Sequence, residues 1–305
     1  MSQAMTIPPF VPALSGVFAA HQSKDGREYP IHLYHPHVFT LAINQQYPHF
    51  SNHYAVNLGA GDGKSCQDPV YPLYEMGYSG LAVDATESDA LFNNLPNPKI
   101  KKILGQFITP INITDLLISN KCPQSPDMLK LDVDGYDGPI LLEILKAGYQ
   151  PKLLQVEVNP EIPPPIEFAV LYDPNYRPLD DNGFQGGFYG ASLAYICNMT
   201  RRFGYHPIQI DFISPWTHDV TLVHHSCLSA VLPLLQNTHH LDSLREMYLA
   251  HPPGYSHFAE YGMDTNTWRH RTDYHELLRE IWHACLVATL TKHKNQPTPF
   301  LLTVS

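Results

Sequence analysis

The stretch Tyr54–Val83, YAVNLGAGDGKSCQDPVYPLYEMGYSGLAV, decides the fold of this chain. Its apolar run AVNL predicts a buried strand that ends at Gly59, and glycines recur at Gly61 and Gly63. Because glycine has no Cβ, such a loop lets backbone N–H groups approach a ligand closely. A second apolar run, LAV, is followed at once by Asp84, and a carboxylate at a strand tip can accept both hydroxyls of a ribose. Together these features predict an adenosine-containing ligand on a doubly wound sheet.

The spacing of the glycines separates two classes of adenosine cofactor. The dinucleotide fingerprint G-x-G-x-x-G needs a third glycine at position 64, where this chain has Lys64. The observed spacing, G-x-G-x-G, is typical of sites for S-adenosylmethionine (SAM), which cradle an amino-acid tail and not a pyrophosphate. A dinucleotide site and a tight turn that binds no ligand are the two alternatives.

The composition bounds the class of protein. The 305 residues, of which 44% are hydrophobic, can build one large domain or two small ones with a sizeable core. A net charge of −10 argues against nucleic acid or an anionic membrane as the main partner, because both favour a basic surface. No apolar run approaches the roughly 18 residues of a membrane-spanning helix, and the N-terminal segment does not resemble a signal peptide.

The cysteines indicate a reducing compartment. They are odd in number, scattered and without a C-x-x-C pair, which favours reduced thiols in a cytoplasmic protein. The five are Cys66, Cys122, Cys197, Cys227 and Cys285.

A regular alternation of apolar runs and helical segments predicts a mostly parallel sheet. The predicted strands are Ala55–Leu58, Leu81–Val83, Lys102–Phe107, Met128–Val133, Leu153–Val158, Ile208–Ile213 and Val220–His224. The predicted helices between them are Ser65–Met76, Asp89–Asn94, Ile113–Ser119, Pro139–Ala147 and Ser192–Phe203. About six residues separate the last two strands, too few for a crossover helix, so these strands should pair antiparallel at the sheet edge.

The chain divides into three predicted parts. Residues 1–50 form an N-terminal cap, residues 51–226 the SAM-binding core, and residues 227–305 a helical C-terminal extension for packing or homo-oligomerisation. Within the core, residues 160–190 break the alternation, and the segments EIPPPIEF and NGFQGGFYGAS should be irregular. This segment either folds over an acceptor as an aromatic lid or packs as a rigid loop. Its aromatic residues are Tyr172, Tyr176, Phe184, Phe188 and Tyr189.

Three segments within residues 51–160 resemble the FkbM-type methyltransferase family: VNLGAGDG, then TDLL with PDMLKLDVDGYDGPILLEIL, then PKLLQVEVNP. The resemblance implies the α/β Rossmann-like fold of class I methyltransferases, with a seven-stranded, mostly parallel sheet and an antiparallel edge strand. It also implies SAM-dependent transfer of a methyl group to a hydroxyl of a small molecule. The chain departs from the family at Asn57, where an acid is usual, and at Asp134, where the family has glutamate.

The resemblance also places the cofactor. A class I site would contact SAM through the glycine loop, with the ribose at the acid after the second strand, the adenine after the third and the sulfonium after the fourth. The expected SAM-binding residues are Asn57, Gly59, Ala60, Gly61, Gly63, Asp84, Gln106, Phe107 and Asp132.

Methyl transfer from a sulfonium is an in-line displacement, in which the protein mainly positions the two partners, and a hydroxyl acceptor also needs a base or a metal. An oxygen-rich set lies at the carboxyl ends of the fourth and fifth strands: Asp132, Asp134, Asp137, Glu157 and Asn159. Catechol-type O-methyltransferases hold Mg²⁺ with an acid after strand four and an adjacent acid–amide pair after strand five. Asp132, Glu157 and Asn159 could hold Mg²⁺ in a similar way, although Glu157 and Asn159 are not adjacent. Alternatively, Asp132 and Glu157 orient the acceptor or act as base, or the set merely caps turns. His225, beside the last strand, is a further candidate base.

Three functions compete on these residues. The first is the SAM-dependent methyltransferase, the second an NAD(P)-dependent oxidoreductase, and the third a non-catalytic protein that binds SAM or a partner. Lys64 counts against the oxidoreductase, because it replaces the third glycine of the dinucleotide fingerprint.

Overall fold

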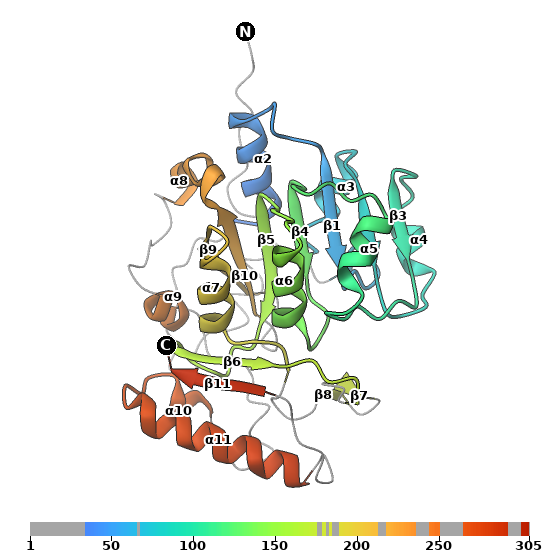
Figure 1. Ribbon diagram of the computed structural model, residues 1–305. Coiled ribbons are helices and arrows are strands. Elements are labelled where there is room, and N and C mark those ends of the chain that lie inside the picture. Colours follow the sequence, from blue (N-terminus) through green and yellow to red (C-terminus); the bar gives the residue numbers. More distant parts are fainter. Residues whose placement is uncertain are drawn as a thin grey trace.

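The computed structural model describes residues 34–65, 68–175, 179–180, 183–184, 189–212, 218–235, 244–250, 265–291 and 300–304, with a seven-stranded sheet at the centre (Figure 1). The strand order is β3-β2-β1-β4-β5-β10-β9. The first five strands run parallel, and β10 is antiparallel to both β5 and β9. The predicted α/β Rossmann-like methyltransferase fold is thereby confirmed. The strands are β1 Tyr54–Leu58, β2 Ser79–Val83, β3 Ile100–Ile103, β4 Met128–Leu131, β5 Leu153–Val158, β9 Tyr205–Phe212 and β10 His218–His224.

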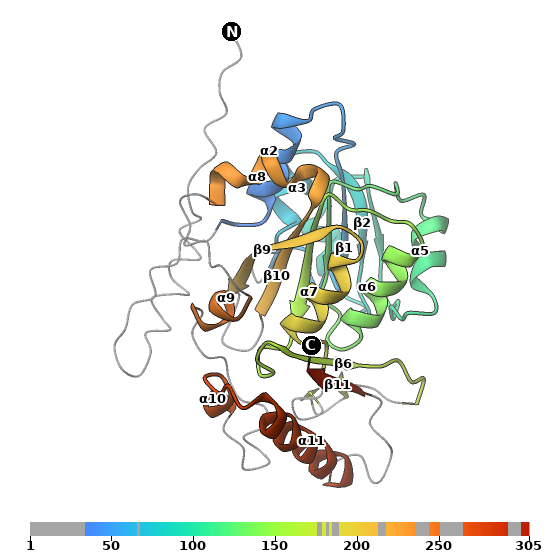
Figure 2. The ribbon, with the colours of Figure 1, turned by 60° about the vertical axis from the view of Figure 1, so that its left-hand side comes forward.

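Helices cover both faces of the sheet, because a parallel sheet is buried on both sides (Figure 2). On one face α5, α6 and α7 share a core with strand residues such as Leu129 and Val156. On the other face α2, α3, α4 and α8 share a core with Ala55 and Met128. The helices are α2 His37–Gln46, α3 Tyr71–Glu75, α4 Ala90–Asn94, α5 Ile113–Ser119, α6 Asp137–Lys146, α7 Leu193–Arg201, α8 Leu228–Leu235, α9 Leu244–Ala250, α10 Thr265–Trp268 and α11 Tyr274–Thr291.

Two predicted elements differ from the observed ones. The helix predicted over Ser65–Met76 shortens to α3, because a proline fits only the first turn of a helix. Pro69 precedes α3, and Pro72 lies in its first turn. The strand predicted over Lys102–Phe107 is shifted towards the N-terminus, and β3 ends before Gly105, whose φ of 66° is left-handed.

The segment expected to be irregular contains three strands. Two are short: β7, Leu179–Asp180, pairs antiparallel with β8, Gly183–Phe184, which lies within NGFQGGFYGAS. Ile166–Val170 forms β6, which pairs antiparallel with β11, Phe300–Val304. The prolines of EIPPPIEF all precede β6, so its backbone donors are intact. This two-stranded sheet encloses a separate small core around Phe168, to which α10 contributes Trp268 and α11 contributes Ile281. The expectation that EIPPPIEF is irregular was therefore wrong at its end, and the C-terminal extension supplies a strand as well as helices.

The small sheet lies across the carboxyl ends of the main strands. Figures 1 and 2 show β6, β11 and α11 as a layer beneath the lower ends of β4 and β5. Of the residues predicted to form the lid, Tyr176 and Phe188 lie outside the described residues, and only the backbone of Phe184 is described. Residues 1–33 of the predicted cap also lie outside them. No helix in the described part of the chain has the length and apolarity to cross a membrane.

Candidate active site

The glycine loop after β1 adopts the conformation that its glycines predict. Gly59, Gly61 and Gly63 have φ values of 78°, 54° and 77°, in the left-handed region that favours glycine. A Cβ on Gly59 would lie 1.5 Å from the carbonyl oxygen of Asp132, so the close approach of the loop to the end of β4 requires glycine. By contrast, a Cβ on Gly61 would meet no heavy atom within 4 Å, which leaves space at the loop tip.

The predicted ribose acid is joined directly to this loop. The Gly61 N–H donates to Asp84 Oδ2 at 2.6 Å, and the Thr86 N–H donates to Oδ1 at 2.7 Å. A carboxylate oxygen can accept more than one hydrogen bond, so Asp84 retains capacity for ribose hydroxyls. Gln106 donates its backbone N–H to the Asp84 carbonyl, and the Phe107 ring is 62% exposed beside it. Gly61, Asp84, Gln106 and Phe107 are thus brought together at the carboxyl edge of β1, β2 and β3.

Asn57, the departure from the family pattern, sits beside a buried acid. Its Nδ2 donates to Asp68 Oδ2 at 2.7 Å, and both side chains are buried. Its Oδ1 is buried and has no hydrogen-bond partner among the described residues. Burial raises the pKa of Asp68, whereas the Lys130 ammonium and the Asn57 amide lower it. Asp68, 11 positions later in the chain, thus places a carboxyl beside Asn57.

Lys130 connects the glycine loop to the acids. Its Nζ donates to the Gly59 carbonyl at 2.9 Å and lies 3.0 Å from Asp132 Oδ2 and 3.8 Å from Asp68 Oδ2. Burial alone would lower the pKa of Lys130, but the carboxylates of Asp132, Asp68 and Asp219 outweigh it and raise the pKa. Lys130 was not among the predicted site residues, although a lysine inside the buried strand MLKLDV is a signal for a paired charge.

A row of buried polar side chains crosses five strands in register. It consists of Asn57 in β1, Lys130 in β4, Gln155 in β5, Thr221 in β10 and Gln209 in β9. Because side chains alternate along a strand, the next row on the same face lies two positions nearer the carboxyl edge. That second row contains Asp132, Glu157 and Asp219, and Asp219 is paired with Glu157 in the β10–β5 register.

Three carboxylates converge at this edge. Asp132, Asp134 and Glu157 each place an oxygen within 4.8 Å of the other two. Glu157 is 1% exposed, and neither of its oxygens has a hydrogen-bond partner among the described residues. Burial, reinforced by the neighbouring acids, raises the pKa of Glu157 well above its usual range and that of Asp134 to about 6. Such a group must take up protons or bind a cation.

Asn159, a predicted metal ligand, is engaged in holding the backbone. Its Nδ2 donates to the Tyr189 carbonyl at 3.2 Å, and its Oδ1 accepts the Glu161 N–H at 2.9 Å. The third carboxylate of the cluster is instead Asp134, which the sequence placed in the oxygen-rich set but not among the ligands. The predicted role of Asn159 as a ligand stays a prediction.

The structure does not bring His225, the predicted base, to the acids. The preceding residue, His224, donates its N–H to the carbonyl of Lys152, which stands just before β5 begins. His225 therefore lies at the amino edge of the sheet, about 20 Å from the acids along a six-residue strand. Its position follows from strand direction: β10 runs antiparallel, so its first residue, His218, reaches the carboxyl edge and its last does not.

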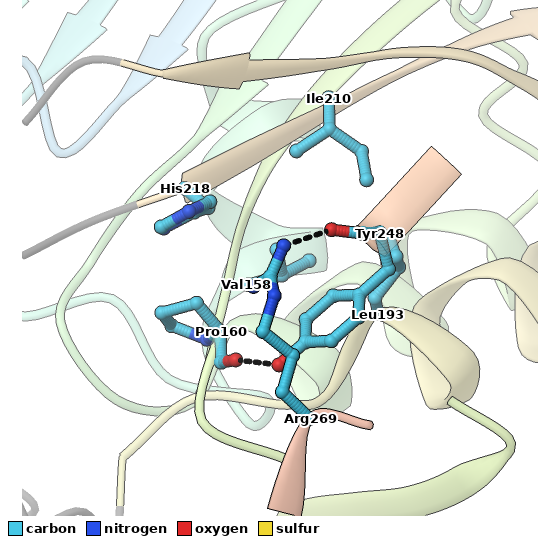
Figure 3. Close-up of a pocket in the computed structure, with 7 residues that line it drawn as sticks. All are labelled: Val158, Pro160, Leu193, Ile210, His218, Tyr248 and Arg269. Carbon is cyan, nitrogen blue, oxygen red and sulfur yellow. Dashed lines mark hydrogen bonds between the residues drawn. The ribbon is translucent and has the colours of Figure 1, made fainter. Parts of the chain in front are cut away.

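A small cavity lies on the face of the sheet opposite to the carboxylates (Figure 3). It is lined by Val158, Pro160, Leu193, Ile210, His218, Tyr248 and Arg269. The Tyr248 hydroxyl donates to the Pro160 carbonyl, and Arg269 donates to the Tyr248 carbonyl, each at 2.6 Å. Because Val158 and His218 alternate with Glu157 and Asp219, this cavity and the carboxylates lie on opposite faces. The cavity is therefore separate from the candidate site.

No protein-family model and no curated protein matches this chain. It is similar to a Burkholderia thailandensis 1,6-didemethyltoxoflavin-N1-methyltransferase with bound S-adenosylhomocysteine, at 12% identity over 71% of this chain and 92% of that one, with a TM-score of 0.38. It is also similar to an O-methyltransferase from Bacillus cereus in complex with SAH, at 13% identity over 72% and 93%, with a TM-score of 0.35. A protein of the NADB-Rossmann superfamily from Streptococcus agalactiae aligns at 10% identity over 82% and 85%, with a TM-score of 0.34. These scores lie below 0.5, so function is inferred from the residues of the site.

Proposed function

We propose that this protein is a SAM-dependent methyltransferase. The observation that carries the proposal is the joined pair of glycine loop and acid, in which the Gly61 N–H binds the Asp84 carboxylate beside an open loop tip. This arrangement suits a nucleoside whose ribose meets Asp84 and whose adenine lies by the exposed ring of Phe107. On the other side of the loop, the Asn57 oxygen, which has no hydrogen-bond partner in the part of the chain that the structure describes, is a suitable acceptor for an ammonium group.

The carboxyl ends of β4 and β5 would then hold the reacting groups. When bound, SAM supplies a methyl group on a sulfonium that is already activated for displacement. Asp132 lies next to Gly59 and carries a partly exposed side chain, so it can face either the sulfonium or the acceptor. We propose a hydroxyl of a small molecule as acceptor, with Glu157 or Asp132 receiving its proton.

We further propose that the three converging carboxylates hold a divalent cation such as Mg²⁺. The donors fit, because hard carboxylate oxygens are the ligands that Mg²⁺ prefers, and Glu157 has two unpartnered oxygens in the described part of the chain. A cation here would lower the pKa of a bound hydroxyl and so assist its deprotonation. Asp132, Asp134 and Glu157 would be its protein ligands.

Calorimetry tests the cofactor. We expect S-adenosylhomocysteine (SAH) and SAM to bind and NAD not to bind. NAD binding without SAH binding would identify an oxidoreductase and end the proposal. Binding of SAH by a protein that methylates no hydroxyl-bearing small molecule in a broad screen would favour the non-catalytic alternative. Titration of Mg²⁺ into the SAH complex tests the cation. The heat of Mg²⁺ binding should disappear when excess EDTA is present.

A further inference from the structure

Asp134 stands in a backbone conformation that few non-glycine residues adopt. Its φ is 56°, which places a non-glycine residue in the left-handed region. Residues held in this region persist where neighbouring contacts over-determine them, and they cluster at functional sites. This conformation directs the Asp134 carboxylate to within 4.8 Å of Asp132 and Glu157.

One buried carboxylate binds the backbone on both sides of Asp134. Asp137 Oδ1 accepts the N–H of Val133 at 2.9 Å, and Asp137 Oδ2 accepts the N–H of Gly135 at 3.1 Å. These are the residues immediately before and after Asp134. Asp137 is 0% exposed, so water does not compete for either hydrogen bond.

This use of Asp137 differs from ordinary helix capping. Asp137 is the first residue of α6, where a carboxylate usually accepts N–H groups of its own helix. Here both hydrogen bonds run backwards into the turn, and neither serves α6. The far side of the turn is anchored as well, because the Gly135 carbonyl accepts the N–H of Gly190 at 2.9 Å.

We propose that Asp137 is a positioning residue, which holds Asp134 in the left-handed conformation and thereby brings the third carboxylate to the cluster. The role of the completed cluster rests on the proposed function, but the hold on the turn does not. Asp137 acts through Asp134 and touches neither substrate nor cofactor in this assignment.

Two substitutions at Asp137 remove its hydrogen bonds to the turn to different extents. Asp137→Ala removes both hydrogen bonds, and Asp137→Asn keeps one acceptor while turning an amide donor towards the other N–H. The matched control is Asp134→Asn, because asparagine tolerates the left-handed region and only the charge is lost. Thermal unfolding identifies the variants that fold. If Asp137→Ala does not fold, the test is made with Asp137→Asn alone.

Three measurements then test the assignment. We expect SAH affinity to change less than about twofold in Asp137→Asn, because the glycine loop follows β1 and its acid Asp84 follows β2. Mn²⁺, used as the cation probe in calorimetry, should bind at least about tenfold more weakly to Asp137→Asn and to Asp134→Asn. The double variant should bind Mn²⁺ no more weakly than Asp134→Asn alone, because Asp137 acts through Asp134. If the losses of Mn²⁺ affinity from the two single substitutions instead multiply in the double variant, the proposal is overturned.

A crystal structure of Asp137→Asn decides the case independently of the cation. We expect residue 134 to leave the left-handed region or to become disordered. An unchanged residue 134 would overturn the proposal even if the proposed function holds. If wild-type protein binds SAH but no Mn²⁺, the cation part of the proposed function fails, and the crystal structure still tests the hold on the turn.

Discussion

At the scale of single residues, two glycines with similar backbone conformation and similar space around them allow an effect on ligand binding to be distinguished from an effect on the fold. Gly61 and Gly77 both have positive φ, of 54° and 91°, and a Cβ on either would meet no heavy atom within 4 Å. Only Gly61 belongs to the loop that binds Asp84. Any difference between matched substitutions at these positions therefore reports on the ligand and not on packing.

We expect Gly61→Val to abolish SAH binding while the protein stays folded. The valine would strain the loop by about 1–2 kcal/mol and place its side chain in the space at the loop tip. Gly77→Val should cost similar stability and leave SAH affinity within about twofold. Calorimetry for binding and urea unfolding for stability check both. Equal SAH affinity in the two variants would place the cofactor elsewhere.

The raised pKa of Asp134 predicts a pH dependence of stability. Burial, with Asp132 close by, raises this pKa from 3.8 to about 6, so the folded state holds the proton more tightly than the unfolded state. The free energy of unfolding should therefore fall as pH rises from about 4 through 6, by roughly 1.4 kcal/mol per unit of pKa shift. Asp134→Asn lacks this group, so we expect it to gain about 2–3 kcal/mol relative to wild type between pH 4 and pH 7.

Denaturant unfolding of both proteins at the two pH values, with EDTA present, measures that difference. Added Mg²⁺ should restore the stability of wild type at pH 7 but not that of Asp134→Asn. A difference between the proteins that does not change with pH would show that Asp134 titrates normally.

At the scale of elements, the sequence predicted the strands and helices that regular local patterns encode. The apolar runs located six strands of the main sheet and placed β3 a few residues too far along the chain, and the six-residue link predicted the antiparallel pairing of β9 with β10. The sequence did not reveal β6, because its partner β11 lies more than 100 positions away, and no local pattern records such a pairing. His225 was misplaced for a related reason, since the edge that a residue reaches depends on strand direction.

The candidate site divides in the same way. Residues adjacent in sequence to a predicted strand end, such as Gly59, Asp84, Asp132 and Glu157, were located correctly at the carboxyl edge. Asp68 and Lys130 were missed, because their roles arise from contacts between elements. A polar residue within an apolar strand would have been the available signal for Lys130.

Asp127 joins three elements at the opposite edge of the sheet, and we expect its loss to destabilise the fold. Its buried carboxylate pairs with Lys152 at the start of β5 and accepts hydrogen bonds from Asn44 in α2 and from Ser51 before β1. Asp127→Ala would leave Lys152 buried and uncompensated, so the free energy of unfolding should fall by about 3–5 kcal/mol.

Urea unfolding measures the loss. The control is Asp115→Ala, an exposed acid in the first turn of α5, which should cost at most about 1 kcal/mol. A similar small change in both variants would contradict the central role of Asp127. SAH affinity of Asp127→Ala should stay unchanged, because this edge is remote from the cofactor loop.

At the scale of the whole molecule, the predicted homo-oligomer through the C-terminal helices leads to a test on α11. Trp282 and Leu286 are 54% and 46% exposed on this helix, one turn apart, and the Trp282 ring packs edge-on against Phe300. Exposed apolar pairs of this kind favour association. If wild-type protein is oligomeric in sedimentation velocity, Trp282→Glu should shift it to the monomer. An unshifted oligomer would place the interface elsewhere.

The pairing of β6 with β11 has a consequence for the order of folding. It joins residues 130 positions apart at its closest pair (300 − 170), whereas β1 to β5 are linked through short βα units. The entropy of closing so long a loop is recovered only after the intervening chain is in place, so this layer should form last. It should also open first. In native-state hydrogen exchange, we expect the amides of β11 to exchange by local opening, while those of β4 and β5 exchange only on global unfolding.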